Sequence, residues 1–329
     1  MKAGVDLGGT KVQAVVVNDR FVVQGQARRA TPTTGGPAAV IAEVAAAVRD
    51  AAEAAGTEVT ALTGVGVGAP GAVDAEAGTV AEAGNLPDWQ EPFAFRPALE
   101  KALNVRVVLA NDVEVAVEAE FRLGAGKPYS SLLGVFWGSG IGGGMVLDGK
   151  SWRGRGAAGE IGHMVIRRNG ARCPCGRRGC VEAYAGRTAM ERRARKLVNQ
   201  GGARTELFEI MEQRGRERLT SAVWAHALEK GDRLAVQLID RAVAALGAGV
   251  ASALNLLDVE AVVIGGGLGV RLGEPYLERI GTAMMPHLFV RDRPPAMMLA
   301  ALGDLGGAIG AARLVKGRTR KASSGASGR

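Results

Sequence analysis

The sequence predicts an α/β protein with a duplicated core. Short apolar segments alternate along the chain with segments whose apolar residues recur at helical spacing, a pattern typical of mixed α/β folds. The strand-like pattern at 4–8 returns at 134–138, so the two halves are expected to be duplicates. Glycine contributes 49 of the 329 residues without a Gly-X-Y repeat. The excess is therefore expected in tight turns and in loops that approach a ligand closely.

The first half begins with three predicted strands. Residues 4–7 and 12–17 are apolar and enclose a glycine turn, and a further apolar segment lies at 21–23. Pro37 then opens a helical pattern that ends before Gly56 and is expected to cover the sheet.

Two β-branched segments complete the first half. Residues 63–69 and 105–110 are predicted to be strands. Asn111 follows the second of them and is well suited to cap a helix that runs through Phe121.

The second half repeats the opening pattern and then continues the α/β alternation. Its strand–turn–strand unit spans 132–147, and the segment from Val181 to about Leu257 is mostly helical by pattern. The remaining predicted elements are a strand at 259–264, a glycine turn at 265–267, a helix at 273–288, a strand at 296–302 and a helix at 305–315.

These elements divide into two predicted lobes. The small α/β lobe covers residues 1–110, with a C-terminal helix at about 305–316 packing back on it, and the large α/β lobe covers 111–304. The basic, Ser- and Gly-rich residues 317–329 are expected to form a disordered tail.

Composition and charge disfavour several classes of protein. Of the net charge of +8, five positive charges lie at 316–329, which leaves only +3 for the rest of the chain. With 4% aromatic residues there are few platforms for stacking bases, so nucleic-acid binding is not expected. The sequence has no run of eighteen apolar residues, and no signal peptide is expected because the N-terminus leads straight into a predicted strand. A cytoplasmic protein without a membrane partner is expected.

Three glycine-rich turns, each after a short apolar strand, favour a nucleotide site, because exposed N–H groups without a neighbouring Cβ can approach phosphate. The segments 66–71 and 138–143 match the spacing of a dinucleotide-binding loop, but Pro70 interrupts the first and neither precedes a helical pattern. The chain also has no P-loop string. The remaining interpretation is that the glycine-rich hairpin turns bind phosphate. The alternative is that they are ordinary glycine-rich hairpins without a ligand.

The cysteines form a single cluster. Cys173, Cys175 and Cys180 are the only cysteines of the chain. Such close spacing suits a metal site better than disulfides.

Four motifs together resemble the ROK family of sugar kinases and repressors. They occur in the expected order over residues 4 to about 315, and they are Gly4–Lys11, the glycine turn at 138–144, Gly159–His163 and Cys173–Glu182. The resemblance implies the actin-like ATPase (ribonuclease H-like) fold, with ATP in a cleft between two α/β lobes.

The resemblance also implies an ATP site with Mg²⁺. It places the phosphates against Gly8, Gly9, Thr10, Lys11, Gly138, Ser139, Gly140 and Gly142, and the adenosine near Gly265, Gly266 and Gly267. Asp6 would help to place Mg²⁺ through water, because this ion prefers oxygen ligands. Many members carry Thr at the position of Ser139, and the hydroxyl is kept.

The sugar site implied by the resemblance centres on Asp112 as the catalytic base. A sugar hydroxyl must lose its proton as the γ-phosphoryl group transfers, and a carboxylate within hydrogen-bond reach can accept it. From the Asn111–Asp112 pair alone, an ordinary helix cap remains the alternative. The implied sugar-binding residues are Asn85, Asn111, Asp112, Glu160, His163 and Glu182.

A structural Zn²⁺ site is the expected role of His163, Cys173, Cys175 and Cys180. These residues supply four N/S ligands and leave no open position, whereas buried thiols beside a hydrogen-bonded histidine are the alternative. The ligands lie between Glu160 and Glu182, so loss of the metal is expected to reduce activity before it unfolds the chain.

The expected function is that of an ATP-dependent hexose kinase, with glucose favoured because the segment 182–185 resembles glucokinase members. Kinases of N-acetylhexosamines, fructose or mannose are the alternatives. A sugar-responsive repressor is disfavoured, because only three residues precede Gly4.

A homodimer or homotetramer is expected by family analogy. The basic residues of the segment 187–196 are interpreted as a solvated helix face, with binding of an acidic polymer such as polyphosphate as the alternative.

Overall fold

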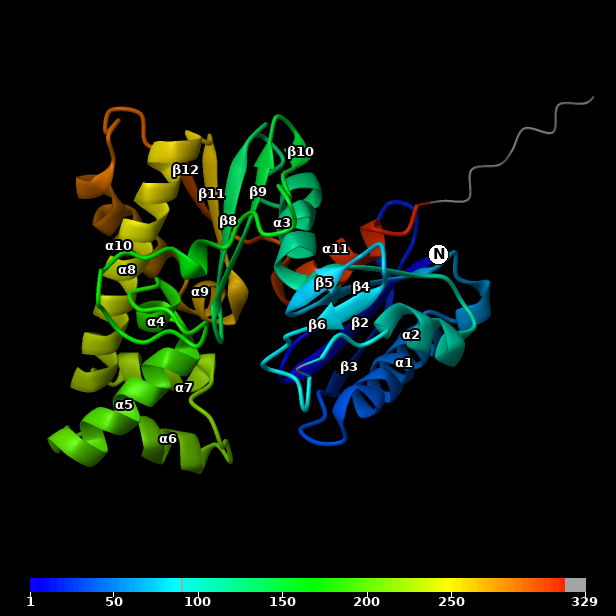
Figure 1. Ribbon diagram of the computed structural model, residues 1–329, viewed down its shortest axis with the longest axis horizontal. Helices are drawn as coiled ribbons and strands as arrows, with labels where there is room; N and C mark the ends of the chain where they lie inside the picture. Colours follow the sequence, from blue (N-terminus) through cyan, green and yellow to red (C-terminus); the bar gives the residue numbers. More distant parts are fainter. Residues whose placement is uncertain (90, 317–329) are drawn as a thin grey trace, which may run out of the picture. The chain divides into compact units, whose positions relative to one another are not determined.

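The computed structural model describes residues 1–89 and 91–316. The tail predicted at 317–329 therefore lies outside the described residues. The chain divides into two compact units, which are residues 1–116 together with the segment from Gly307 onward, and residues 117–306. Figure 1 labels the elements of each unit.

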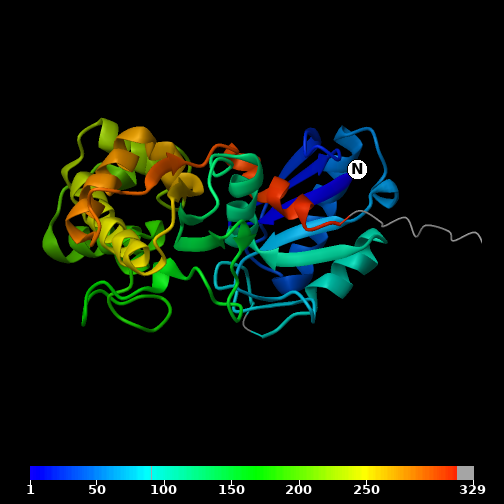
Figure 2. The ribbon, with the colours of Figure 1, turned by 90° about the horizontal axis from the view of Figure 1, so that it is seen from above.

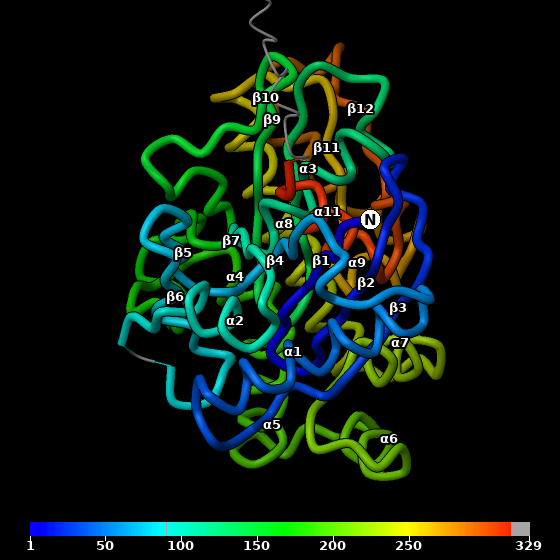
Figure 3. Tube along the Cα trace, turned by 90° about the vertical axis from the view of Figure 1, so that its right-hand side faces the viewer, coloured from blue at the N-terminus to red at the C-terminus, as the bar shows by residue number. Residues whose placement is uncertain are grey.

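The first unit contains a five-stranded sheet in the order β3-β2-β1-β4-β7, which Figure 3 shows from one side. The strands β1, β2 and β3 pair antiparallel, while β1, β4 and β7 pair parallel. Their bounds are Lys2–Leu7 (β1), Lys11–Val17 (β2), Val23–Ala30 (β3), Val65–Ala69 (β4) and Val107–Asn111 (β7).

Helices cover both faces of this sheet. A Cβ atom on Gly25 of β3 would lie 2.4 Å from the carbonyl oxygen of Ala51, so α1 packs directly on one face. On the other face, a Cβ atom on Gly4 would lie 1.9 Å from the carbonyl oxygen of Ala308 in α11. The further elements of the unit are α1 (Gly36–Ala54), α2 (Phe95–Leu103), α11 (Gly306–Arg313), the strand pair β5 (Ala72–Asp74) and β6 (Thr79–Ala81), and a 3-10 turn at Val59–Ala61.

The second unit repeats the sheet topology in the order β10-β9-β8-β11-β12. Here β8, β9 and β10 pair antiparallel, and β8, β11 and β12 pair parallel. Each strand thus has a counterpart in the first sheet, which confirms the predicted duplication. The bounds are Leu132–Trp137 (β8), Ile141–Leu147 (β9), Lys150–Ser151 (β10), Ala261–Gly265 (β11) and Ala296–Leu299 (β12).

The helices of the second unit lie mainly on one face of its sheet, as Figures 1 and 2 show for the yellow and orange segments. The other face receives α3 (Asp112–Leu123), because a Cβ atom on Gly134 would lie 2.3 Å from Cγ2 of Val117. The remaining helices are α4 (Glu182–Ala185), α5 (Arg187–Gly201), α6 (Leu207–Gln213), α7 (Ser221–Glu229), α8 (Arg233–Leu257), α9 (Gly266–Leu272) and α10 (Glu274–Met284), with 3-10 turns at Ile161–His163, Met285–His287 and Gly303–Leu305.

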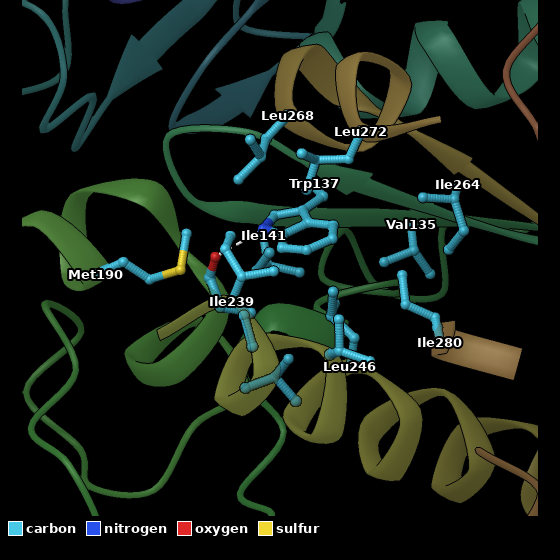
Figure 4. Close-up of a cluster of buried hydrophobic side chains, with 14 of the residues drawn as sticks. Val135, Trp137, Ile141, Met190, Ile239, Leu246, Ile264, Leu268, Leu272 and Ile280 are labelled. Carbon is cyan, nitrogen blue, oxygen red and sulfur yellow. Dashed lines mark hydrogen bonds between the residues drawn. The ribbon is translucent and has the colours of Figure 1, made fainter. Parts of the chain in front are cut away.

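The core of the second unit packs around Trp137. Its ring is fully buried beside Ile141 and Ile239, and its Nε1 donates to the carbonyl oxygen of Ala185 at 2.7 Å (Figure 4). The helix α8 passes through this core. It is long and apolar enough to cross a membrane by composition, but 67% of its most apolar window is buried inside the protein, as expected for a core helix.

Several predicted elements differ from the structure, among them the strand predicted at 296–302, which ends at Leu299. The third strand runs over Val23–Ala30 instead of 21–23, because it is an edge strand whose polar side chains alternate with few buried ones. In place of the predicted turn at 265–267, β11 ends at Gly265 and α9 begins directly at Gly266. The helix predicted at 273–288 ends at Met284, close to Pro286, and gives way to a 3-10 turn.

Candidate functional site

The turn between β1 and β2 is built from glycine. The amide of Gly8 donates to the carbonyl oxygen of Lys11 at 2.9 Å, and the hydroxyl of Thr31 donates to the carbonyl oxygen of Gly8 at 2.6 Å. A Cβ atom on Gly9 would lie 2.8 Å from Cβ of Asn85. The structure therefore brings the predicted phosphate turn and the predicted sugar residue Asn85 into contact.

Asp6 is half-buried near the carboxyl end of β1. A Cβ atom on Gly307 would lie 2.8 Å from its Cγ, so the carboxyl group faces the first turn of α11. The positive end of a helix dipole favours a carboxylate at such a place.

Asn111 and Asp112 join β7 to α3. The side-chain oxygen Oδ1 of Asn111 accepts from the amides of Val113 at 3.0 Å and Glu114 at 3.2 Å, so Asn111 caps the helix as predicted. Asp112 is half-buried, and its Oδ1 accepts from the amide of Val113 at 2.9 Å. The cap thus fixes Asp112 in the first turn of α3.

The two predicted carboxylates lie at one edge of the first sheet. Asp6 pairs with Gly68 of β4, and Gly68 pairs with Ala110 of β7. A Cβ atom on Gly68 would lie 2.7 Å from Cγ2 of Val115 and 3.2 Å from Cα of Asp112, so a side chain there would require α3 to shift. The parallel strands therefore carry both carboxylates to their common carboxyl edge, where open α/β sheets bind ligands.

In the second unit, the turn between β8 and β9 docks on the start of α5. The amide of Gly138 donates to the carbonyl oxygen of Gly140 at 3.0 Å. The carbonyl oxygens of Gly138 and Ser139 accept from the amides of Arg187 at 3.1 Å and Thr188 at 3.0 Å. The turn is thus held in place by the first N–H groups of the helix.

Glu182 also meets this turn. Its Oε2 accepts from the amide of Ile141 at 2.9 Å, and a Cβ atom on Gly140 would lie 2.3 Å from the same oxygen. Gly142 lies opposite Phe136 in the β8–β9 pairing. The predicted sugar residue Glu182 is therefore anchored to the predicted phosphate turn.

His163 lies between Glu160 and the cysteines. Its Nε2 is 3.9 Å from Oε2 of Glu160, while its Nδ1 is 3.8 Å from Sγ of Cys173. The Sγ atoms of Cys175 and Cys180 are 3.8 Å apart, and the four ligand atoms all lie within 4.8 Å of one another. A tetrahedral Zn²⁺ site with Zn–S bonds of about 2.3 Å requires ligand separations of about 3.8 Å. The cluster fits this ion.

The cysteines differ in acidity. Burial raises the pKa of Cys173 to about 12. Burial also acts to raise the pKa of Cys175, but hydrogen bonds from Arg177 and from the other two thiols lower it to about 6. A bound cation would favour the thiolate form of all three, because metal ligation and deprotonation are linked.

The third glycine segment lies beside the second turn. A Cβ atom on Gly265 would lie 2.7 Å from the Phe136 ring, and Gly266 adopts a positive φ of 79°. A Cβ atom on Gly267 would lie 3.6 Å from Oγ of Ser221. The segment approaches β8 and Ser221 closely, although it starts a helix rather than forming the predicted turn.

Arg187 connects these two segments. Its Nη2 donates to Oγ of Ser139 at 2.9 Å, and its Nη1 donates to Oγ of Ser221 at 2.8 Å. Burial lowers the pKa of Arg187, and the charge of Arg218 lowers it further. The interpretation of residues 187–196 as one solvated face was wrong for this first residue. Its place at the first position of a helical pattern, directly after Gly186, was the available signal.

A model of the ROK family matches residues 2–318. The chain belongs to the ROK family. The glucokinase of Thermotoga maritima is 33% identical over 321 residues, covering 96% of this chain and 97% of the relative. The N-acetylgalactosamine kinase AgaK of a Shewanella species is 31% identical over 326 residues, covering 96% and 97%.

The crystal structure of a ROK family glucokinase from Streptomyces griseus, in complex with glucose and AMPPNP, superposes on this ROK chain with a TM-score of 0.80. The two are 31% identical, and the match covers 95% of this chain and 98% of the other. The expected actin-like ATPase fold is thereby confirmed.

The predicted residues of this ROK protein gather in local groups within each unit. In the first unit these are the Gly8–Lys11 turn with Asn85, and Asp6 with Asn111 and Asp112; in the second they are Gly138–Gly142 with Glu182, Gly265–Gly267 beside Ser221, and Glu160 with His163 and the cysteines.

Proposed function

We propose that this ROK protein is an ATP-dependent hexose kinase that transfers the γ-phosphoryl group of ATP to the 6-hydroxyl of glucose. The observation that carries the proposal is the near-complete match to a glucokinase that was crystallised with glucose and an ATP analogue. The local groups described above supply residues suited to both substrates.

In this proposal, Asp112 is the general base. Its place in the first turn of α3, behind the Asn111 cap, holds a carboxylate at the carboxyl edge of the sheet. Because the transition state of phosphoryl transfer is loose, Asp112 acts mainly by orienting the 6-hydroxyl and accepting its proton as the bond to phosphorus forms. Asn85, Glu160, His163 and Glu182 are the proposed partners of the other sugar hydroxyls.

The phosphates of ATP are assigned to the glycine turns. The backbone amides of Gly8–Lys11 and Gly138–Gly142 are the proposed donors, and the hydroxyl of Ser139 adds another. We assign Arg187 to the same role, since its guanidinium donates a hydrogen bond to the Ser139 hydroxyl and can form charge-assisted hydrogen bonds with phosphate oxygens at the same place. Gly265–Gly267 are assigned to the adenosine.

The metals have separate roles. Mg²⁺ would be held by the ATP phosphates and, through water, by Asp6, and it neutralises charge on the transferred group. Zn²⁺ would be held by His163, Cys173, Cys175 and Cys180, where it orders the segment between Glu160 and Glu182. We further propose a cytoplasmic homodimer or homotetramer, in line with the family resemblance.

The substrate is tested by a panel of hexoses and N-acetylhexosamines assayed with ATP. Glucose is expected to give the highest kcat/KM. A relative named as an N-acetylgalactosamine kinase is 31% identical, close to the 31–34% of the glucokinases, so the panel includes that sugar. A kcat/KM for an N-acetylhexosamine above that for glucose would contradict glucose as the substrate but would agree with the proposed sugar kinase activity. If no sugar is turned over, both parts of the proposal are contradicted.

A further inference from the structure

A basic pocket lies in the second unit, apart from the residues assigned to ATP, sugar or zinc. It has a volume of about 680 Å³, within the range of small-molecule sites. Its wall comes from the loop at 167–178 and from the helices α4, α5 and α8. None of its lining residues has a role in the proposed reaction, so the pocket requires its own explanation.

The charge of this pocket is entirely positive. The loop contributes Arg167, Arg172 and Arg178. The helices contribute Arg192, Arg193 and Lys196 from α5, and Arg241 from α8. Among the described residues that line the pocket there is no acidic side chain.

These cations also lack carboxylate partners. Within residues 1–89 and 91–316, no Asp or Glu lies within ion-pair distance of any of the seven. Their neighbours behave differently, because Arg195 and Arg218 pair with Glu191 at 2.9 Å and 3.0 Å. Glu191 thus neutralises these two neighbours, whereas the described chain places no carboxylate within ion-pair distance of the cations that line the pocket.

Neutral groups hold the pocket cations in place. Nη2 of Arg192 donates to the carbonyl oxygen of Arg172 at 3.3 Å, and Arg241 lies over the ring of Tyr184 at 5.6 Å. The Tyr184 hydroxyl accepts from the amide of Ala171 at 2.9 Å, which ties the loop to α4. Carbonyls and a ring leave the full charge of each guanidinium and most of its N–H donors available.

The floor of the pocket is apolar. Met190 and Leu238 line it with 1% and 3% of their surface exposed. An apolar floor lowers the local dielectric and strengthens attraction between the cations and a bound anion.

We propose that this pocket binds an anion that carries several linked phosphate groups. Seven like charges repel one another, and a ligand with several negative charges relieves that repulsion where a neutral sugar does not. The planar guanidinium group matches two phosphate oxygens at once. The ligand is either a free chain of inorganic phosphates or the phosphate tail of a nucleotide, and the two share the same chemistry.

The test is titration calorimetry of the zinc-loaded protein with tripolyphosphate at physiological ionic strength. The pocket variant is Arg193→Gln/Lys196→Gln, which removes two charges that make no hydrogen bond within the described chain. The control is Arg214→Gln/Arg216→Gln, which removes two exposed charges outside the pocket. We expect the pocket variant to weaken binding at least about tenfold and the control to change it less than about twofold.

Two further measurements complete the test. Circular dichroism checks that both variants fold, and the variant Arg193→Lys/Lys196→Arg, which keeps the charge, should retain binding. Equal losses in the pocket and control variants, or no binding by the parent protein, would overturn the proposal. So would a single-stranded oligonucleotide that binds more tightly than tripolyphosphate and loses its binding in the pocket variant.

Titration with ATP identifies the source of the phosphates. A second ATP per chain that disappears in the pocket variant supports the nucleotide tail. Tripolyphosphate binding without a second ATP supports the free chain. Because the readout is binding, a failed kinase assay would leave this result unaffected.

Discussion

The guanidinium of Arg187 donates to the hydroxyl of Ser139 at 2.9 Å and to that of Ser221 at 2.8 Å. This residue therefore joins the glycine turn after β8 to the start of α7, next to Gly267. No carboxylate among the described residues lies within ion-pair distance of it. A half-buried arginine whose partners are two neutral hydroxyls is available to an anion at the same place.

The first prediction concerns Arg187→Gln. We expect the KM for ATP to rise about 10- to 100-fold, because a charge-assisted hydrogen bond to phosphate is lost, while the KM for glucose changes little. Steady-state kinetics measure both constants, and equilibrium binding of ADP and adenosine separates phosphate from base contacts. Arg187→Lys should recover part of the loss, and Arg214→Gln, which removes an exposed charge outside the basic pocket, serves as the control. If Arg187→Gln weakened the binding of ADP and adenosine equally, Arg187 would act only by stabilising the local structure and not by contacting phosphate.

The second prediction concerns Gly9→Ala. The added Cβ would lie 2.8 Å from Cβ of Asn85 and 2.9 Å from its carbonyl oxygen, so the turn or the Asn85 loop must shift. We expect kcat/KM to fall at least about tenfold, since small displacements at a reacting site are costly. Gly201→Ala is the control, because a Cβ there meets nothing within 4 Å. Wild-type kinetics in Gly9→Ala would show that the contact with Asn85 is irrelevant to turnover.

The third prediction concerns removal of zinc. Chelation should abolish most of the activity while the far-ultraviolet circular dichroism stays close to that of the loaded protein, because the proposed zinc site would order only the segment between Glu160 and Glu182. Zinc content by atomic absorption should be about one per chain before chelation, and zinc added back should restore activity. Full activity in metal-free protein would contradict a role for the cluster in the sugar site.

The fourth prediction concerns Glu191 and pH. Burial acts to raise its pKa, but hydrogen bonds from Arg195 and Arg218 lower the pKa below its ordinary value of 4.5. A carboxyl group with a lowered folded-state pKa stabilises the fold above its unfolded pKa and loses that contribution as the pH falls below it. Glu191→Gln should therefore lower the free energy of unfolding by about 1–3 kcal/mol at neutral pH.

Urea denaturation at several pH values checks this prediction. The difference between the parent protein and Glu191→Gln should be constant near neutrality and shrink as the pH falls below about 4.5. A difference that stays constant across this range would show that the carboxylate charge does not contribute.

Much of the fold could be predicted from the sequence because strand and helix periodicities depend on local residues. The duplication was visible because 4–8 and 134–138 carry the same pattern, and the two sheets have the same order. The edge strand Val23–Ala30 was missed because its exposed side chains lack an apolar run. The start of α9 at Gly266 was missed because glycine indicates a turn more often than a helix.

The site was less accessible to sequence reasoning. The motifs indicate the segments to which we assign the proposed site, but the partner of a polar side chain depends on tertiary packing. Arg187 and Arg193 look alike in the sequence. The first donates hydrogen bonds to two serine hydroxyls, whereas the second lines a basic pocket. The residues that line the pocket extend from Arg167 in the loop to Arg241 in α8. Because they are far apart along the chain, no local sequence pattern reveals the pocket.

The most direct test of the proposed mechanism is the kcat of Asp112→Asn with glucose and ATP. The amide preserves the size of the side chain but cannot accept the proton. The account predicts that kcat falls about 10²- to 10⁴-fold while equilibrium binding of glucose and nucleotide persists, with the exposed Asp19→Asn as control. A kcat equal to that of the parent protein would contradict Asp112 as the base.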